Sequence, residues 1–168
     1  WNQGRLDEAA RMFESLATAC RKTGLWEPPA LVSLSAILLE QGSVEEAEQI
    51  IMSILPSTEP NTLYHGLLCA NLAEVQARQG DGPRARAHIE QAVRMTIGRR
   101  GGIFVLRVTL TKARVLAELG ELEAAQRTLH TAGMLMEEEG VGEPSFLMRH
   151  FRSSQALTYK QARQSTPQ

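Results

Sequence analysis

The chain has 168 residues, of which 43% are hydrophobic and 22% are charged, a size and composition that allow one continuous core. Eighteen basic residues nearly balance nineteen acidic ones, and the formal net charge is −1. A balanced charge of this kind recruits neither nucleic acid nor an anionic membrane surface, so we expect no direct nucleic-acid binding.

Four windows of the sequence, residues 2–16, 40–54, 78–92 and 118–132, align without gaps. Each contains a glycine, an alanine five positions later, and a large apolar residue four positions after that. Successive glycines are 38, 38 and 40 residues apart, so the chain is built from internal repeats. The aligned residues are Gly4, Gly42, Gly80 and Gly120; Ala9, Ala47, Ala85 and Ala125; and Phe13, Ile51, Ile89 and Leu129.

This pattern predicts a helical hairpin. A glycine at the end of the first helix accepts the left-handed backbone conformation that terminates it. The small alanine allows the second helix to approach the first closely, and the large residue one turn later fills their interface. Each window therefore marks the turn and the second helix of a hairpin.

In chain order, we expect a trailing helix within residues 1–23, then hairpins at 29–55, 60–97 and 102–139, then a final helix at 144–162. Residues 1–3 have the character of the last turn of a helix that ends at Gly4, so we expect this chain to be part of a larger protein. The β-branched run at 103–110 is compatible with a strand, but its place in the repeat favours a helix. The prediction is a single all-α domain over 1–168 with about eight helices and no strands.

The windows resemble tetratricopeptide repeats, through the turn glycine and the alanine that follows it. The repeats here are 38 to 40 residues long instead of 34. The small residue expected seven positions before the glycine is Ser35, Ala73 or Ala113. Longer repeats of this kind are similar to the arrays of bacterial regulators of the LuxR and maltose-regulator type. The resemblance implies a right-handed α–α superhelix in which the first helix of each hairpin lines a concave groove.

Carried over by distance from the turn glycine, the resemblance assigns seven residues to a partner-binding groove centred on residues 61–79 and 103–119. The chaperone-binding members of the family hold a terminal carboxylate with a lysine and asparagines. The matching positions here include Val32, Ala70 and Ala36, so we do not expect that clamp. The seven groove residues are Leu67, Glu74, Arg78, Arg107, Leu110, Arg114 and Glu118.

Arg107 and Arg114 are seven residues apart, which places them on one side of a helix about two turns apart. Such a pair is able to grip an acidic peptide or a phosphate. The alternative, which we favour, is a solvated helix face whose arginines form salt links to Glu74 or Glu118.

The sequence contains no recognisable catalytic or metal-binding set. The four histidines, His65, His88, His130 and His150, do not recur at metal-ligand spacing and suit helix surfaces or packing positions. No nucleophile can be paired with a base from spacing alone, and no phosphate-binding motif occurs. We therefore expect a non-enzymatic protein without a cofactor.

The function that follows from the resemblance is a protein-interaction scaffold that holds a partner peptide or helix in its groove. The alternative is an effector-sensing or self-assembly segment of a larger transcriptional or signalling regulator. An end repeat that lacks its neighbour leaves apolar surface exposed, so we expect the chain either to self-associate or to need the rest of its parent protein. The longest apolar runs, such as 50–55, are too short for a membrane span. Cys20 and Cys69 suit reduced packing positions, with a disulfide as the alternative, which favours the cytoplasm.

Overall fold

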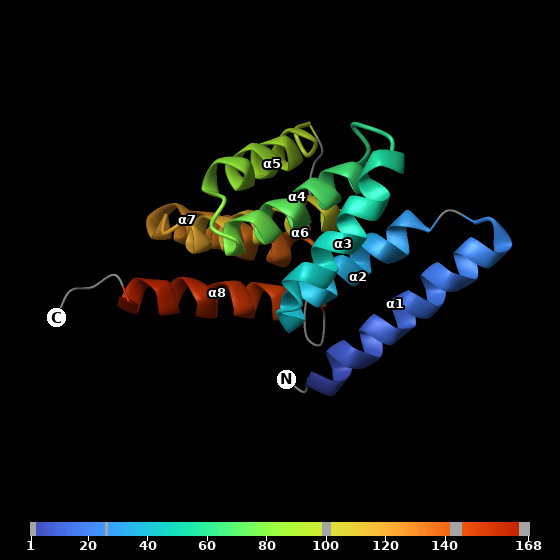
Figure 1. The fold of residues 1–168 in the computed structure, drawn as a ribbon. Coiled ribbons are helices and arrows are strands. Elements are labelled where there is room, and N and C mark those ends of the chain that lie inside the picture. Colours follow the sequence, from blue (N-terminus) through green and yellow to red (C-terminus); the bar gives the residue numbers. More distant parts are fainter. Residues whose placement is uncertain (1–2, 26, 99–101, 142–145, 165–168) are drawn as a thin grey trace.

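The computed structural model describes residues 3–25, 27–98, 102–141 and 146–164 (Figure 1). These residues form helices and contain no strand, which confirms the all-α prediction. The helices are α1 (Gln3–Thr23), α2 (Pro28–Gln41), α3 (Val44–Ile54), α4 (Leu63–Arg78), α5 (Gly82–Arg94), α6 (Gly102–Glu118), α7 (Leu122–Glu138) and α8 (Phe146–Gln164), with a short 3₁₀ turn at Leu55–Ser57 after α3.

Three hairpins, α2–α3, α4–α5 and α6–α7, form the body of the molecule, and a glycine turn joins the two helices of each. Gly42, Gly80 and Gly120 have φ values of +86°, +82° and +78°, in the left-handed region that glycine enters without strain. The residue after each glycine donates its N–H to a carbonyl of the first helix, as Asp81 does to Gln76 at 2.8 Å. The turn residues thus satisfy the carbonyls that the helix ends leave without partners.

The first of the four windows behaves differently. Gln3 begins α1, and Gly4 continues it as a helical residue. The prediction that Gln3 belongs to the end of a preceding helix is therefore wrong, because the backbone at Gly4 stays helical instead of turning. Trp1 and Asn2 lie outside the described residues.

The hairpins stack so that their first helices form an inner layer. α4 packs against both α2 and α6, and α6 packs against α8, while α3, α5 and α7 cover the other side (Figure 1). The alanines that the repeat pattern singled out, Ala47, Ala85 and Ala125, are fully buried. So are the small residues of the first helices, Ser35, Ala73 and Ala113. Close approach of two helices at small residues explains why both positions recur.

Helix ends differ from the predicted ones by a few residues. α4 begins at Leu63 instead of Asn61, because Asn61 has a φ of +66° and the Thr62 side chain caps the helix by accepting the His65 N–H at 3.2 Å. α5 ends at Arg94, three residues before the predicted end at Ile97. These differences do not move any residue of the inner layer.

Candidate partner-binding surface

The inner layer carries a buried network of charged side chains, with Arg114 of α6 at its centre. Arg114 Nη2 lies 2.9 Å from Glu74 Oε1 of α4, and its Nη1 contacts the Glu40 carboxylate of α2. The side chains of all three residues are at most 7% exposed. Burial lowers the pKa of Arg114, but the charges of Glu74 and Glu40 outweigh it and raise that pKa above its usual value.

Glu40 joins the network to α8. His150 Nδ1 lies 2.5 Å from Glu40 Oε1, and the Ser153 hydroxyl lies 3.2 Å from the same oxygen. Burial raises the pKa of Glu40, but the hydrogen bond from His150 and the positive charge of Arg114 outweigh it and hold that pKa at about 2. Glu40 is therefore a carboxylate at neutral pH and only accepts hydrogen bonds, so His150 Nδ1 carries the proton between them.

Arg78 of α4 completes the network on the other side. Its Nη2 lies 2.5 Å from Glu74 Oε1, and its Nη1 donates to the backbone carbonyl of Leu39 at 2.8 Å. Its Nε lies 3.9 Å from Glu118 of α6. The Glu74 carboxylate thus pairs with two arginines, Arg78 and Arg114. The network connects the four helices α2, α4, α6 and α8.

Four of the seven predicted groove residues, Glu74, Arg78, Arg114 and Glu118, come together in this network. Arg114 and Glu74 form the salt link that we favoured, but the pair is buried instead of lying on a solvated helix face. Nε of Arg78 and Nε of Arg114 are buried and have no hydrogen-bond partner among the described residues, but both guanidinium groups pair with carboxylates. This part of the inner layer is therefore closed by the protein's own charges.

Leu67 and Leu110, which the resemblance also placed in the groove, lie in the core. Leu67 is 2% exposed and Leu110 is fully buried. Leu110 packs with Leu106 and with residues of α7 and α8. Neither leucine is therefore accessible to a partner.

Arg107, the seventh predicted residue, lies outside this network, in the wall of an open apolar cleft. The cleft has a volume of about 360 Å³ and lies between α1, α2, α6 and α8. Its walls are formed by Ala9 and Phe13, Ser33 and Ile37, Ile103 and Arg107, and Leu147. We call this space the Arg107 cleft.

Arg107 is the charged residue in these walls. Among the described residues, no carboxylate forms an ion pair with it. Burial lowers its pKa to about 10, and a nearby Tyr64 partly opposes that shift. The guanidinium is therefore still positively charged at neutral pH, but it is poorly hydrated and has no protein counter-ion within the described part of the chain.

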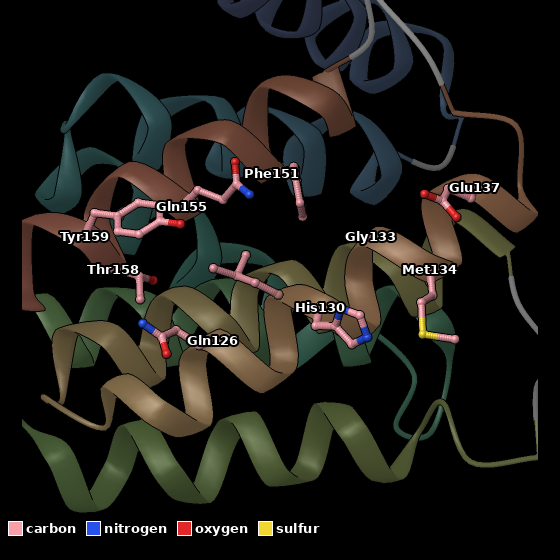
Figure 2. A pocket seen from close by; sticks show the side chains of 10 residues that line it. Gln126, His130, Gly133, Met134, Glu137, Phe151, Gln155, Thr158 and Tyr159 are labelled. Atoms are coloured by element: carbon pink, nitrogen blue, oxygen red, sulfur yellow. The ribbon is translucent and has the colours of Figure 1, made fainter.

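A second hollow, of about 560 Å³, lies between α7 and α8 (Figure 2). Figure 2 shows side chains of both helices around it, among them Gln126 and His130 from α7 and Gln155 and Tyr159 from α8. Its lining is more polar and offers less apolar surface than that of the Arg107 cleft. We therefore regard the Arg107 cleft as the better docking site.

The sequence prediction missed Glu40 and His150. Glu40 stands two positions before Gly42, as Arg78 and Glu118 stand two positions before their own turn glycines. Alignment on the turn glycine therefore places Glu40 at the same repeat position as Arg78 and Glu118, and it was enough to predict Glu40 as a member of the network. His150 had none, because α8 is followed by no turn glycine to which it can be aligned.

No group of three or more His, Cys, Asp or Glu side chains within the described residues is arranged to hold a metal ion. None of the described helices is long and apolar enough to cross a membrane.

The fold and the repeat geometry define this chain as an α-helical repeat protein built from glycine-linked hairpins. The family model for the tetratricopeptide repeat matches residues 66–91 and 106–131, which lie in the α4–α5 and α6–α7 hairpins. These two hairpins are tetratricopeptide repeats. A search of curated proteins finds no match to it.

Proposed function

We propose that this chain is a protein-interaction module that binds a partner segment in the Arg107 cleft. Tetratricopeptide repeats in general mediate protein–protein interaction. The observation that carries the proposal is a guanidinium with no ion pair among the described residues, set in an open apolar wall. A partner that supplies a carboxylate there gains a charge-assisted hydrogen bond in a poorly hydrated place.

The shape of the cleft indicates what else the partner must carry. Phe13, Ile37 and Leu147 present apolar side chains to a space that holds one or two large side chains. Burying such side chains contributes about 1.5 to 3 kcal/mol each. The expected ligand is therefore a peptide segment with a large apolar residue close to an aspartate or glutamate.

This proposal narrows the groove predicted from the sequence. We expect Arg107 to bind the partner directly. Substitution of Arg114 also weakens binding, but indirectly, because it leaves Glu40 and Glu74 buried without their shared cation. The two substitutions therefore differ in their effect on the stability of the protein. Arg114→Met lowers the free energy of unfolding by about 3 kcal/mol, whereas Arg107→Met leaves it nearly unchanged.

Selection from a phage-displayed random peptide library tests the proposal. We expect enriched peptides that pair a large apolar residue with Asp or Glu, and at least a tenfold loss of their affinity for the Arg107→Met variant. Arg84→Met is the matched control, because Arg84 is 76% exposed on α5, away from the cleft. Peptides that bind the Arg107→Met variant as tightly as the unmodified chain contradict the assignment.

A further inference from the structure

A further open groove lies between α5 and α7, and α6 forms its floor. It has a volume of about 460 Å³ and shares no lining residue with the Arg107 cleft. Arg107 and Lys112 are five positions apart in α6, a spacing that places them on different sides of that helix. We call this space the Lys112 groove, and it is separate from the site of the proposed function.

Lys112 replaces a core leucine of the other hairpins. It stands eight positions before its turn glycine, as Leu34 and Leu72 stand eight positions before theirs. Those leucines are 2% and 4% exposed, but Lys112 is half-buried and lies in the open groove. Packing within the array therefore does not require a cation at this position, because leucine fills it in two hairpins of the same chain.

The groove carries positive charge with little compensation. No acidic side chain of the described residues lines it, and none of their carboxylates forms an ion pair with Lys112. Arg127 of α7 also lines the groove. Its Nη1 lies 3.7 Å from Glu123, but these side chains are 74% and 92% exposed, so the pair contributes little and is readily exchanged. An anionic ligand therefore complements the groove.

Four threonines of the groove offer hydrogen-bond acceptors. Each donates its hydroxyl proton to a backbone carbonyl three or four positions earlier, over 2.7 to 3.1 Å, and its oxygen is still able to accept a hydrogen bond. A phosphate ion offers mainly acceptors, whereas an extended peptide presents an N–H group at each residue other than proline. The groove therefore suits a peptide better than a phosphate. The threonines are Thr96, Thr109, Thr128 and Thr131.

A buried apolar floor lies beneath these polar groups. Val108 and Leu116 of α6 are buried, and Val93 of α5 forms part of one wall. A ligand side chain that covers this floor removes apolar surface from water. The groove thus combines two cations, a set of hydrogen-bond acceptors and an apolar floor.

We propose that the Lys112 groove binds an acidic, extended segment of a partner protein. An aspartate or glutamate of that segment pairs with Lys112 and Arg127, and backbone N–H groups beside it donate to the threonine oxygens. An apolar residue next to the acid packs on the floor. This site adds to the Arg107 cleft, and the two assignments are tested independently.

The position of the groove favours a partner protein as the source of the segment. Apart from Thr96, every lining residue belongs to a helix, so no described connection of this chain fills the groove. The groove lies within the array, between the second helices of two complete hairpins, and each of its helices already packs on its repeat neighbours. Tetratricopeptide repeats in general mediate protein–protein interaction, which gives the class of partner.

Selection from a phage-displayed random peptide library tests the proposal. The target is the Arg107→Met variant, so that binding to the cation of the Arg107 cleft is removed. We expect enriched peptides that carry an Asp or Glu beside an apolar residue. Anisotropy of a fluorescently labelled synthetic copy measures the affinity of the strongest binder.

Lys112→Leu, made in the same background, removes the cation and inserts the residue of the other hairpins. We expect no loss of thermal stability and a loss of affinity of about tenfold or more. Lys112→Arg keeps the charge and most of the affinity. Lys22→Leu is the matched control, because Lys22 is exposed on α1, which does not line the groove, and it leaves the affinity unchanged. Equal affinities for Lys112→Leu and its parent overturn the assignment.

A double-mutant cycle tests the ion pair. Lys112→Leu in the protein and replacement of the peptide acid by its amide each lower the affinity, and the two changes together lower it no further. Fully additive losses show that the acid does not meet Lys112, and they overturn the pairing. Thr128→Val removes one acceptor at nearly constant volume and lowers the affinity several-fold. An unchanged affinity in Thr128→Val, Thr109→Val and Thr131→Val overturns the backbone contacts.

Other occupants are separated by two measurements. If inorganic phosphate displaces the peptide and sodium chloride of equal ionic strength does not, the groove is a phosphate site and the peptide assignment is wrong. If light scattering finds a dimer that Lys112→Leu converts to a monomer, the occupant is a segment of a second copy and the partner protein is wrong. Peptides selected on the unmodified chain that require Arg107 support the proposed function whatever the result in the groove.

Discussion

His150 Nδ1 lies 2.5 Å from Glu40 Oε1, although the two residues are 110 positions apart in the chain. The contact joins the last described helix, α8, to the first helix of the first complete hairpin, α2. Glu40 also holds Arg114 of α6, so one carboxylate connects three helices. Because removing one partner of a buried ion pair leaves an uncompensated charge, this carboxylate makes α2, α6 and α8 depend on one another.

Glu40→Gln tests that dependence. The amide removes the negative charge that Arg114 and His150 face, and we expect the free energy of unfolding to fall by about 3 kcal/mol. Glu123→Gln is the matched control, because the Glu123 side chain is 92% exposed and pairs with Arg127 one turn away. Its effect stays within about 0.5 kcal/mol. Urea unfolding measures both variants, and equal losses contradict a stabilising role for the network.

Stability should also depend on pH through Glu40. Its pKa falls from 4.5 to about 2 on folding, so the unfolded chain binds the proton more readily than the folded one. The stabilisation, about 3 kcal/mol, is complete above pH 4.5 and is lost as the pH falls toward 2. Urea unfolding between pH 6 and pH 3 measures it. We expect a shallower decline in Glu40→Gln than in the unmodified chain, and parallel declines refute this assignment.

The repeated alanine predicts a steric effect. Ala85 is fully buried where α5 meets α4, so Ala85→Leu forces the two helices apart and costs about 1 to 3 kcal/mol. Ala87 lies two residues later on the exposed side of the same helix, and Ala87→Leu is expected to be neutral. Thermal unfolding compares the pair. A neutral Ala85→Leu indicates that the hairpin does not need a small residue at this position.

Two glycines are expected to respond in opposite directions to the same substitution. Gly80 has a φ of +82°, so Gly80→Ala strains the turn and costs about 1 kcal/mol. Gly133 lies inside α7, and a Cβ there meets the Phe151 ring at 3.8 Å, an ordinary contact. Gly133→Ala therefore stabilises the protein by about 0.5 to 1 kcal/mol through helix propensity. Thermal unfolding decides, and shifts of the same sign contradict one of the two explanations.

The hairpins were predictable because their signals are local. The turn glycine and the alanine five residues later are close in the chain, so their spacing reports directly on one turn and one helix face. Gly4 was misleading for the same reason: the local pattern matched, but the backbone at Gly4 continues α1 instead of turning. The boundary at Leu63 depended on the conformation of Asn61, which spacing does not show.

The groove was only partly predictable. The salt link between Arg114 and Glu74 follows from the charges that neighbouring repeats place at one position, and we expected it. The contact between Glu40 of α2 and His150 of α8 was not predictable, because the distance between these two helices depends on how all the hairpins stack.

What the sequence determined by itself is the repeat: which residues turn, which are small, and which are buried in each hairpin, because short-range backbone geometry and helical periodicity decide these. Only the tertiary structure decided which charges neutralise one another and which remain open. Stacking brings Glu40, Arg114 and His150 together from three helices and leaves Arg107 in an apolar cleft. Electrostatic pairing depends on distances of a few ångströms between helices, and no pattern along one chain specifies those distances.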